Sequence, residues 1–269
     1  MEKEYYSKVS IIFLVILVGI SPFGIFLYAF ANVLVESLMA TNVKAIEFIA
    51  LNDLFFSITI SAISTSISII IGGLISFYLL NFSKSALNYG ILNIVLVLPH
   101  IGFAYIIYLF FSDTGFLSRL LNLIGIENDL PLINDTLGIG IILNYVLKEV
   151  PFVILYLLAT NKTEVKNHIF AARDLGAGFL QTFLKIYVPL NSVQIVSISI
   201  VIFAFVLGNY EVPFLLGGNA PQFLSVSALS NFQSIDLDQN IASYLKAVII
   251  FTTAFVVSVI LRLCVREKR

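Results

Sequence analysis

Three ionisable residues inside long apolar stretches are the first candidates for a chemical role. Lys148 and Glu149 stand side by side near the middle of the stretch 137–160, and Glu211 lies near the end of the stretch 189–216. A charged side chain is costly in hydrocarbon, so each one retained there is a candidate for function. Pro151 and Pro213 follow closely, and a proline inside a helix permits a kink. We expect Lys148, Glu149, Glu211 and Pro213 to line or gate a path, with structural pairing between helices as the alternative.

Residues for enzyme chemistry are sparse. An intramembrane enzyme needs a nucleophile beside a base, or a metal cluster, whereas the only histidines are His100 and His168 and the only cysteine is Cys264. His100 has no second ligand at metal-binding spacing, so we expect it to form a hydrogen bond within a helix bundle. The phosphate-binding pattern Gly-x-x-x-x-Gly-Lys-Ser/Thr does not occur. The sequence thus predicts no catalytic residue, no metal site and no cofactor in this chain.

The elements that must position these residues are membrane-spanning helices. Of the 269 residues, 59% are hydrophobic and 12% are charged, and the mean hydropathy is +1.01. A soluble domain carries about twice that fraction of charge. We therefore predict an all-α integral membrane protein with six transmembrane helices, at about 9–32, 53–80, 89–111, 137–160, 189–216 and 244–264. Residues 1–50 would form the first helix and an external loop, and residues 51–269 a five-helix core.

The distribution of basic residues predicts the orientation. Eleven of the fifteen Lys and Arg would lie on one side of the membrane: Lys3, Lys8, Lys84, Lys162, Lys166, Arg173, Lys185, Arg262, Arg266, Lys268 and Arg269. The positive-inside rule then places both termini in the cytoplasm. The predicted external loops are acidic, which mildly favours a cationic solute, although ordinary solvated loops explain them as well. A net charge of −1 gives no reason to expect nucleic-acid binding.

A stripe of small residues follows one face of the stretch 53–80. Its members recur at three- and four-residue spacing: Ser57, Ser61, Ser64, Thr65, Ser68, Gly72 and Ser76. Such a stripe allows close packing of helices, and it is equally able to line a water-filled path.

The longest predicted cytoplasmic loop, 161–188, has its own helical pattern. Residues 165–175 favour a helix, and Gly176 is the residue type expected just past a helix end. The chain then continues amphipathically, and Pro189 would open the next span at its first turn. The pattern predicts two short helices joined at a glycine along the inner face of the membrane.

This loop resembles the cytoplasmic signature of binding-protein-dependent ABC importer permeases. The signature has Glu-Ala-Ala, then Gly, then Ile, and then Leu-Pro at fixed spacing. The matching residues here are Ala171, Ala172, Gly176, Ile186 and Pro189, with Val188 in the Leu place and Phe170 in the Glu place. Other stretches look more loosely like permeases for polyamines, ferric iron or thiamine.

The resemblance implies a MetI-like type I permease fold in which the 165–176 helix docks in a groove of a separate ATP-binding subunit. Arg173 and Asp174 would be available for charged contacts there, while Phe170 removes the carboxylate of the signature. The implied partners are two ATP-binding-cassette subunits, which carry ATP and Mg²⁺, a second permease, identical or different, and an external solute-binding protein. The location would be a bacterial or archaeal cytoplasmic membrane. The alternative is a stand-alone secondary transporter, although the inverted repeats expected of one are not visible in the sequence.

Overall fold

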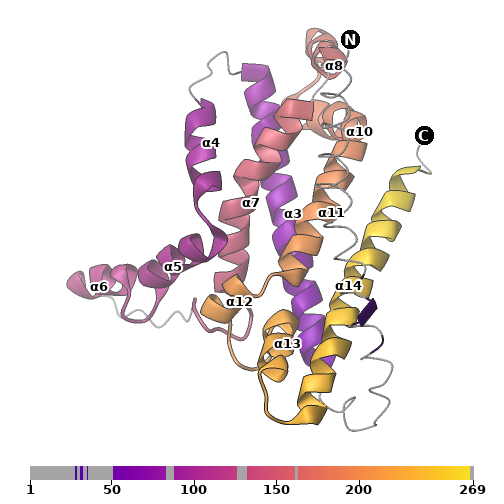
Figure 1. Cartoon of the computed structure of the whole chain (residues 1–269). Coiled ribbons are helices and arrows are strands. Elements are labelled where there is room, and N and C mark those ends of the chain that lie inside the picture. The colour runs from indigo at the N-terminus through magenta and orange to yellow at the C-terminus, as the bar shows by residue number, and fades with distance from the viewer. Residues whose placement is uncertain are drawn as a thin grey trace, which may run out of the picture. The chain divides into compact units, whose positions relative to one another are not determined.

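The computed structural model describes residues 51–82, 88–125, 132–160 and 163–266, together with residues 28, 31, 32 and 35. Within this part of the chain, every regular element is a helix (Figure 1). The elements are α3 (Leu51–Phe82), α4 (Asn88–Val97), α5 (His100–Phe111), α6 (Phe116–Leu123), α7 (Ile139–Thr160), α8 (Thr163–Asp174), α9 (Phe179–Thr182), the π-helix η1 (Phe183–Tyr187), α10 (Val188–Leu190), α11 (Ser192–Gly208), α12 (Glu211–Leu216), α13 (Leu224–Phe232) and α14 (Leu237–Arg266).

Four segments of these helices are long and apolar enough to cross a membrane: Leu51–Leu80, His100–Leu123, Ile139–Thr160 and Asp238–Val265. A bent pair, Phe179–Leu190 with Ser192–Gly208, makes a fifth candidate if it counts as one span. The predicted all-helical membrane class is therefore confirmed. The predicted first span, 9–32, lies outside the described residues, so the count of six stays a prediction.

Contacts divide the chain into two units. One holds Ala50–Ser227 with Ile250–Arg269, and the other holds Met1–Ile49 with Ala228–Ile249. In the described part of the second unit, Phe232 packs edge-on against Tyr244, and the Asn240 side chain donates to the Phe232 carbonyl oxygen over 2.8 Å. The division predicted at residue 50 stays a prediction, because nearly all of 1–50 is outside the described part of the chain.

The first unit is built on α3 and α7, which pack against each other, with α11 beside them (Figure 1). The polar stripe of α3 is buried: Ser57, Ser61, Ser64, Thr65, Ser68 and Ser76 are each at most 7% exposed. At Gly72 an added Cβ would lie 2.6 Å from Val153 Cγ1 of α7. Because the glycine permits this approach, the buried stripe favours helix packing over a water-filled path.

The third predicted helix, 89–111, is wrong as a single element. The chain forms α4 and α5 instead, separated by Leu98 and Pro99. Pro99 lacks a backbone N–H and restricts the residue before it, so the helix ends at Val97 and restarts with Pro99 as the N-cap of α5. The extended backbone of Pro99, with φ −63° and ψ 149°, turns the chain between the two helices.

The fifth predicted helix, 189–216, is also divided. It becomes α11 and α12, with Asn209 in an extended conformation between them. Pro189 does not open the span as predicted, because it lies in α10 at the end of the helical segment Phe179–Leu190. That segment meets α11 at 77°. Just before this proline, the Val188 N–H donates to the carbonyl oxygen of Phe183, five residues earlier, which makes a π-turn. The π-turn shifts the helical hydrogen-bond register at the point where Pro189 has no backbone N–H.

Candidate functional site

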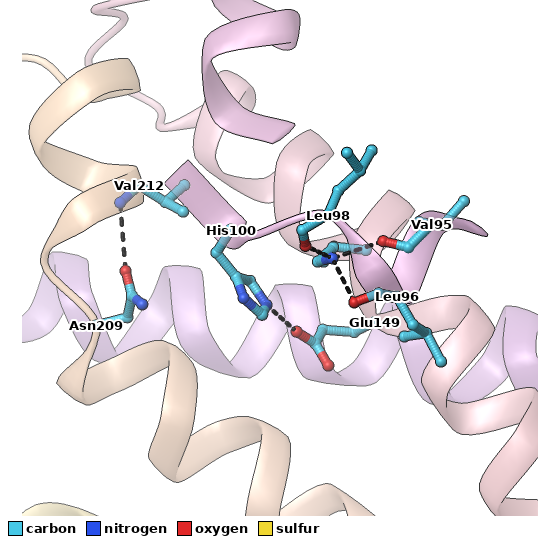
Figure 2. Close-up of polar contacts among 8 residues, drawn as sticks. Val95, Leu96, Leu98, His100, Glu149, Asn209 and Val212 are labelled. Carbon is cyan, nitrogen blue, oxygen red and sulfur yellow. Dashed lines mark hydrogen bonds and ion pairs between the residues drawn. The ribbon is translucent and has the colours of Figure 1, made fainter. Parts of the chain in front are cut away.

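The break between α4 and α5 is bound by Lys148 of α7. Its ammonium donates to the carbonyl oxygens of Val95 at 2.6 Å, Leu96 at 3.4 Å and Leu98 (Figure 2). Val95 and Leu96 belong to the last turn of α4, and Leu98 lies in the break itself. Their carbonyl oxygens lack helical partners because Pro99 stops the helix. A cation at a helix C-terminus is also favoured by the helix dipole. Lys148 is only 2% exposed, so its charge is compensated within the protein.

Glu149 binds the other side of the same break. Its Oε1 lies 3.1 Å from Nε2 of His100, the first residue of α5 (Figure 2). Glu149 is 6% exposed, and consecutive residues of a helix point about 100° apart, so Lys148 and Glu149 reach different partners. Two adjacent residues of α7 thus bind the end of α4 and the start of α5. The hydrogen bond expected for His100 within the bundle is confirmed.

Two hollows meet at His100 and Phe205. One, of about 270 Å³, is lined by Leu96, His100, Lys148, Glu149, Phe152, Val201, Ile202 and Phe205. The other, of about 510 Å³, is lined by His100, Ala204, Phe205, Gly208, Asn209, Tyr210 and Glu211. The rings of His100 and Phe205 lie 4.6 Å apart between their centroids. The structure therefore brings the three charged residues expected to line a path to two adjoining hollows.

The short helix α12 positions Glu211 at the larger hollow. Asn209 ends α11, and its side-chain oxygen accepts a hydrogen bond from the Val212 N–H over 3.2 Å (Figure 2). Glu211 is the first residue of α12 and is half-buried. Pro213 is buried and does not line either hollow. A role for Pro213 in a gate stays a prediction.

The predicted docking helix is α8, with Gly176 just beyond it. Gly176 has a φ of +84°, which favours glycine, and its N–H donates to the Arg173 carbonyl oxygen over 2.8 Å. The next N–H, that of Ala177, donates to the Ala172 carbonyl oxygen over 3.0 Å. This pair of bonds is the Schellman motif, which closes a helix end. The predicted helix and its glycine stop are confirmed.

Helix α8 has one buried face and one exposed face. Val165 and Ile169 are buried in an apolar cluster with Phe77 of α3 and with Phe183 and Tyr187 of η1. The Tyr187 hydroxyl lies 3.0 Å from the Ser76 hydroxyl of α3. This cluster joins α8 to the end of α3 and to the helical segment that leads into α11 (Figure 1).

The exposed face carries the residues that match the signature. Phe170, Ala171, Arg173, Asp174 and Gly176 are exposed, and Ala172 is partly exposed. Phe170, in the place of the signature Glu, is 42% exposed, and the Lys166 ammonium lies 5.7 Å from the centre of its ring. Ile186 is partly buried in η1 and Pro189 is exposed in α10. The signature positions therefore occupy two neighbouring helical segments.

Sequence reasoning missed Phe205 as part of the site. Its spacing in α11 is that of any apolar span residue, and only the fold brings it to His100. His100 stands out in the sequence as a polar residue in an apolar stretch, and the preceding Pro99 is a sequence signal for a helix boundary there. Among the residues that the structure describes, no group of three or more His, Cys, Asp or Glu could hold a metal ion.

Part of the chain is similar in sequence to known proteins. No protein-family model matches the sequence. The spermidine/putrescine transport system permease protein PotB of Escherichia coli K12 is 31% identical over 110 residues. The chain is similar to polyamine transport permeases. The PotB protein of Salmonella typhimurium SL1344 is likewise 31% identical over 110 residues.

The matched stretch is 41% of this chain, 40% of the E. coli protein and 38% of the Salmonella protein. The chain thus spans well under half of the length of the relatives it matches. The predicted resemblance to importer permeases of the polyamine type is confirmed by these relatives.

Proposed function

We propose that the chain is the transmembrane permease subunit of an ATP-binding-cassette importer and forms half of its translocation pathway. The observation that carries the proposal is the two-sided α8. Its buried face is fixed to α3 and η1 through Val165 and Ile169, and its exposed face presents Phe170, Ala171 and Arg173 to a partner. A groove on an ATP-binding subunit that received this face would move α8, and the apolar cluster would pass the movement to the spanning helices.

The partners follow from the same proposal. Two ATP-binding subunits supply ATP and Mg²⁺, a second permease supplies the other half of the path, and an external protein delivers the solute. The location is a bacterial or archaeal cytoplasmic membrane, with both termini in the cytoplasm. Phe170 replaces a carboxylate with an aromatic ring, so contact with the ATP-binding subunit would be mainly apolar at this position.

The path itself is assigned to the two hollows. Lys148 and Glu149 bind both sides of the α4–α5 break, which suits a gate, whereas Glu211 faces the larger hollow. The solute class supported best is a polyamine, because the relatives are named as spermidine/putrescine permeases. Thiamine and ferric iron remain the other solutes that the sequence pattern favours.

Co-purification with a charged variant in the docking face tests the proposal. We expect the affinity-tagged chain to recover an ATP-binding subunit from its native membrane. Ala171→Arg should reduce that recovery at least about tenfold, because a long cation replaces a small exposed side chain at a closely packed contact. The control is Gln233→Arg, which adds the same charge at an exposed residue outside α8.

Equal recovery by wild type and Ala171→Arg would contradict docking through α8. Absence of any ATP-binding subunit with the wild-type chain, together with solute uptake by this chain alone, would contradict the importer and favour a secondary transporter.

A further inference from the structure

Three charged residues line the two adjoining hollows, and they differ in what holds them. Lys148 donates to three carbonyl oxygens, and Glu149 is bound to His100. The Glu211 carboxylate forms no hydrogen bond or ion pair with any residue of the described segments. With Lys148 and Glu149 of opposite charge, Glu211 leaves the hollows with one net negative charge while His100 is neutral.

The walls beside Glu211 are aromatic. Phe205 and Tyr210 line the same hollow of about 510 Å³, and both rings are partly exposed. A carboxylate next to exposed ring faces is suited to an alkylammonium group, since the carboxylate accepts its N–H bonds and the rings attract the cation. The volume lies in the range of small-molecule sites.

We propose that the hollow at Glu211, Tyr210 and Phe205 binds one ammonium group of a linear polyamine during its passage. The proposal rests on the importer function above and adds the contact point for the solute. It also divides the roles of the three charged residues. Glu211 touches the solute, whereas Lys148 and Glu149 hold the α4–α5 break.

A fluorescent reporter in the hollow tests this directly. The chain contains no tryptophan, so Tyr210→Trp places a single indole beside Glu211. The Tyr210→Trp chain in lipid nanodiscs is titrated with spermidine, with putrescine, and with 1,4-butanediol as the uncharged analogue of putrescine. Both amines should change the emission saturably, and the diol should not.

The charge is then removed in the reporter background. Glu211→Gln should raise the half-saturating amine concentration at least about tenfold, as expected for loss of a charged hydrogen-bond partner. Asp113→Asn is the matched control, because Asp113 is an exposed carboxylate outside both hollows and its loss should leave the titration unchanged. Phe205→Trp is a second reporter in the same hollow, in case Tyr210→Trp does not insert.

An unchanged half-saturating concentration in Glu211→Gln would overturn the proposal, as would the absence of amine-dependent emission with both reporters. Loss of permease assembly in Glu211→Gln with unaltered amine affinity would overturn it too, because Glu211 would then bind the second permease. These results are independent of the recovery of an ATP-binding subunit, so failure of this site is distinguishable from failure of the importer function.

Discussion

Lys148 and Glu149 show how two charges are kept within a spanning helix. Each is nearly fully buried, and each is satisfied by a partner at the α4–α5 break. Removing one partner of a buried polar contact leaves the other partner without a hydrogen bond. The free-energy cost of that unsatisfied group exceeds the stability that the contact itself contributes. The pair is therefore expected to stabilise the break between α4 and α5 as well as its own helix.

Replacing Lys148 tests that role. Lys148→Met keeps the length of the apolar stem but leaves the carbonyl oxygens of Val95, Leu96 and Leu98 without their donor. We expect a loss of stability of about 3 kcal/mol, which is the scale of unsatisfied buried polar groups. Thermal unfolding of the purified chain in detergent measures it.

Lys185→Met is the control, since Lys185 is exposed in η1 and its loss should change the unfolding temperature little. If the two variants unfold at the same temperature, Lys148 does not secure the break.

The sequence singles out three charged residues in apolar stretches, but it does not indicate which groups they contact. Lys148, Glu149 and Glu211 stand out because a charge in an apolar span is rare. Their partners could not be derived, because backbone carbonyls at a helix break have no signature in side-chain types. The contact between His100 and Glu149 joins residues 49 positions apart, which no local pattern encodes.

Among the helices, α3 and α7 make the central contact of the first unit. The close approach at Gly72 depends on the missing side chain, since small residues let helix backbones approach closely. The neighbouring Gly73 is in a different situation. A Cβ there would have Phe183 Cζ as its nearest neighbour, at 3.9 Å.

These adjacent glycines give a matched test. Gly72→Ala would place its methyl group 2.6 Å from Val153, so α3 and α7 must separate, at a cost of about 1–3 kcal/mol. Gly73→Ala should be neutral or slightly stabilising, because alanine favours helix and meets no close atom. Thermal unfolding of both variants distinguishes them, and a larger loss in Gly73→Ala would contradict the packing described for α3.

The helix boundaries agree with those predicted from the sequence where an apolar stretch is uninterrupted. They differ from the prediction where a proline or a polar pair interrupts the stretch. The predicted spans 53–80 and 137–160 match α3 and α7 closely. The span 89–111 fails at Pro99, and 189–216 fails at Asn209 and Tyr210. Both predictions failed for the same reason. An apolar stretch indicates residues that suit the lipid, but a continuous helix also needs an unbroken series of backbone hydrogen bonds.

At the scale of the whole molecule, the orientation in the membrane is a prediction from Lys and Arg alone. The single cysteine tests it. Cys264 is exposed near the end of α14 and should lie at the cytoplasmic side. A membrane-impermeant maleimide should label it in inverted membrane vesicles and not in right-side-out vesicles.

A second cysteine position provides the opposite control. Asp113→Cys, in a Cys264→Ser background, should be labelled in right-side-out vesicles, because Asp113 is exposed in a predicted external loop. Labelling of Cys264 from the outside would reverse the predicted orientation and place α8 away from a cytoplasmic ATP-binding subunit.

The proposed function requires that ATP hydrolysis by a partner subunit drives solute movement through this chain. The most direct measurement is uptake of radiolabelled spermidine into proteoliposomes that contain the assembly recovered with the tagged chain, with the external binding protein added. We expect spermidine to accumulate when ATP is enclosed at the cytoplasmic face, and not to accumulate with a non-hydrolysable analogue. Accumulation driven by a proton gradient in the absence of ATP would contradict it.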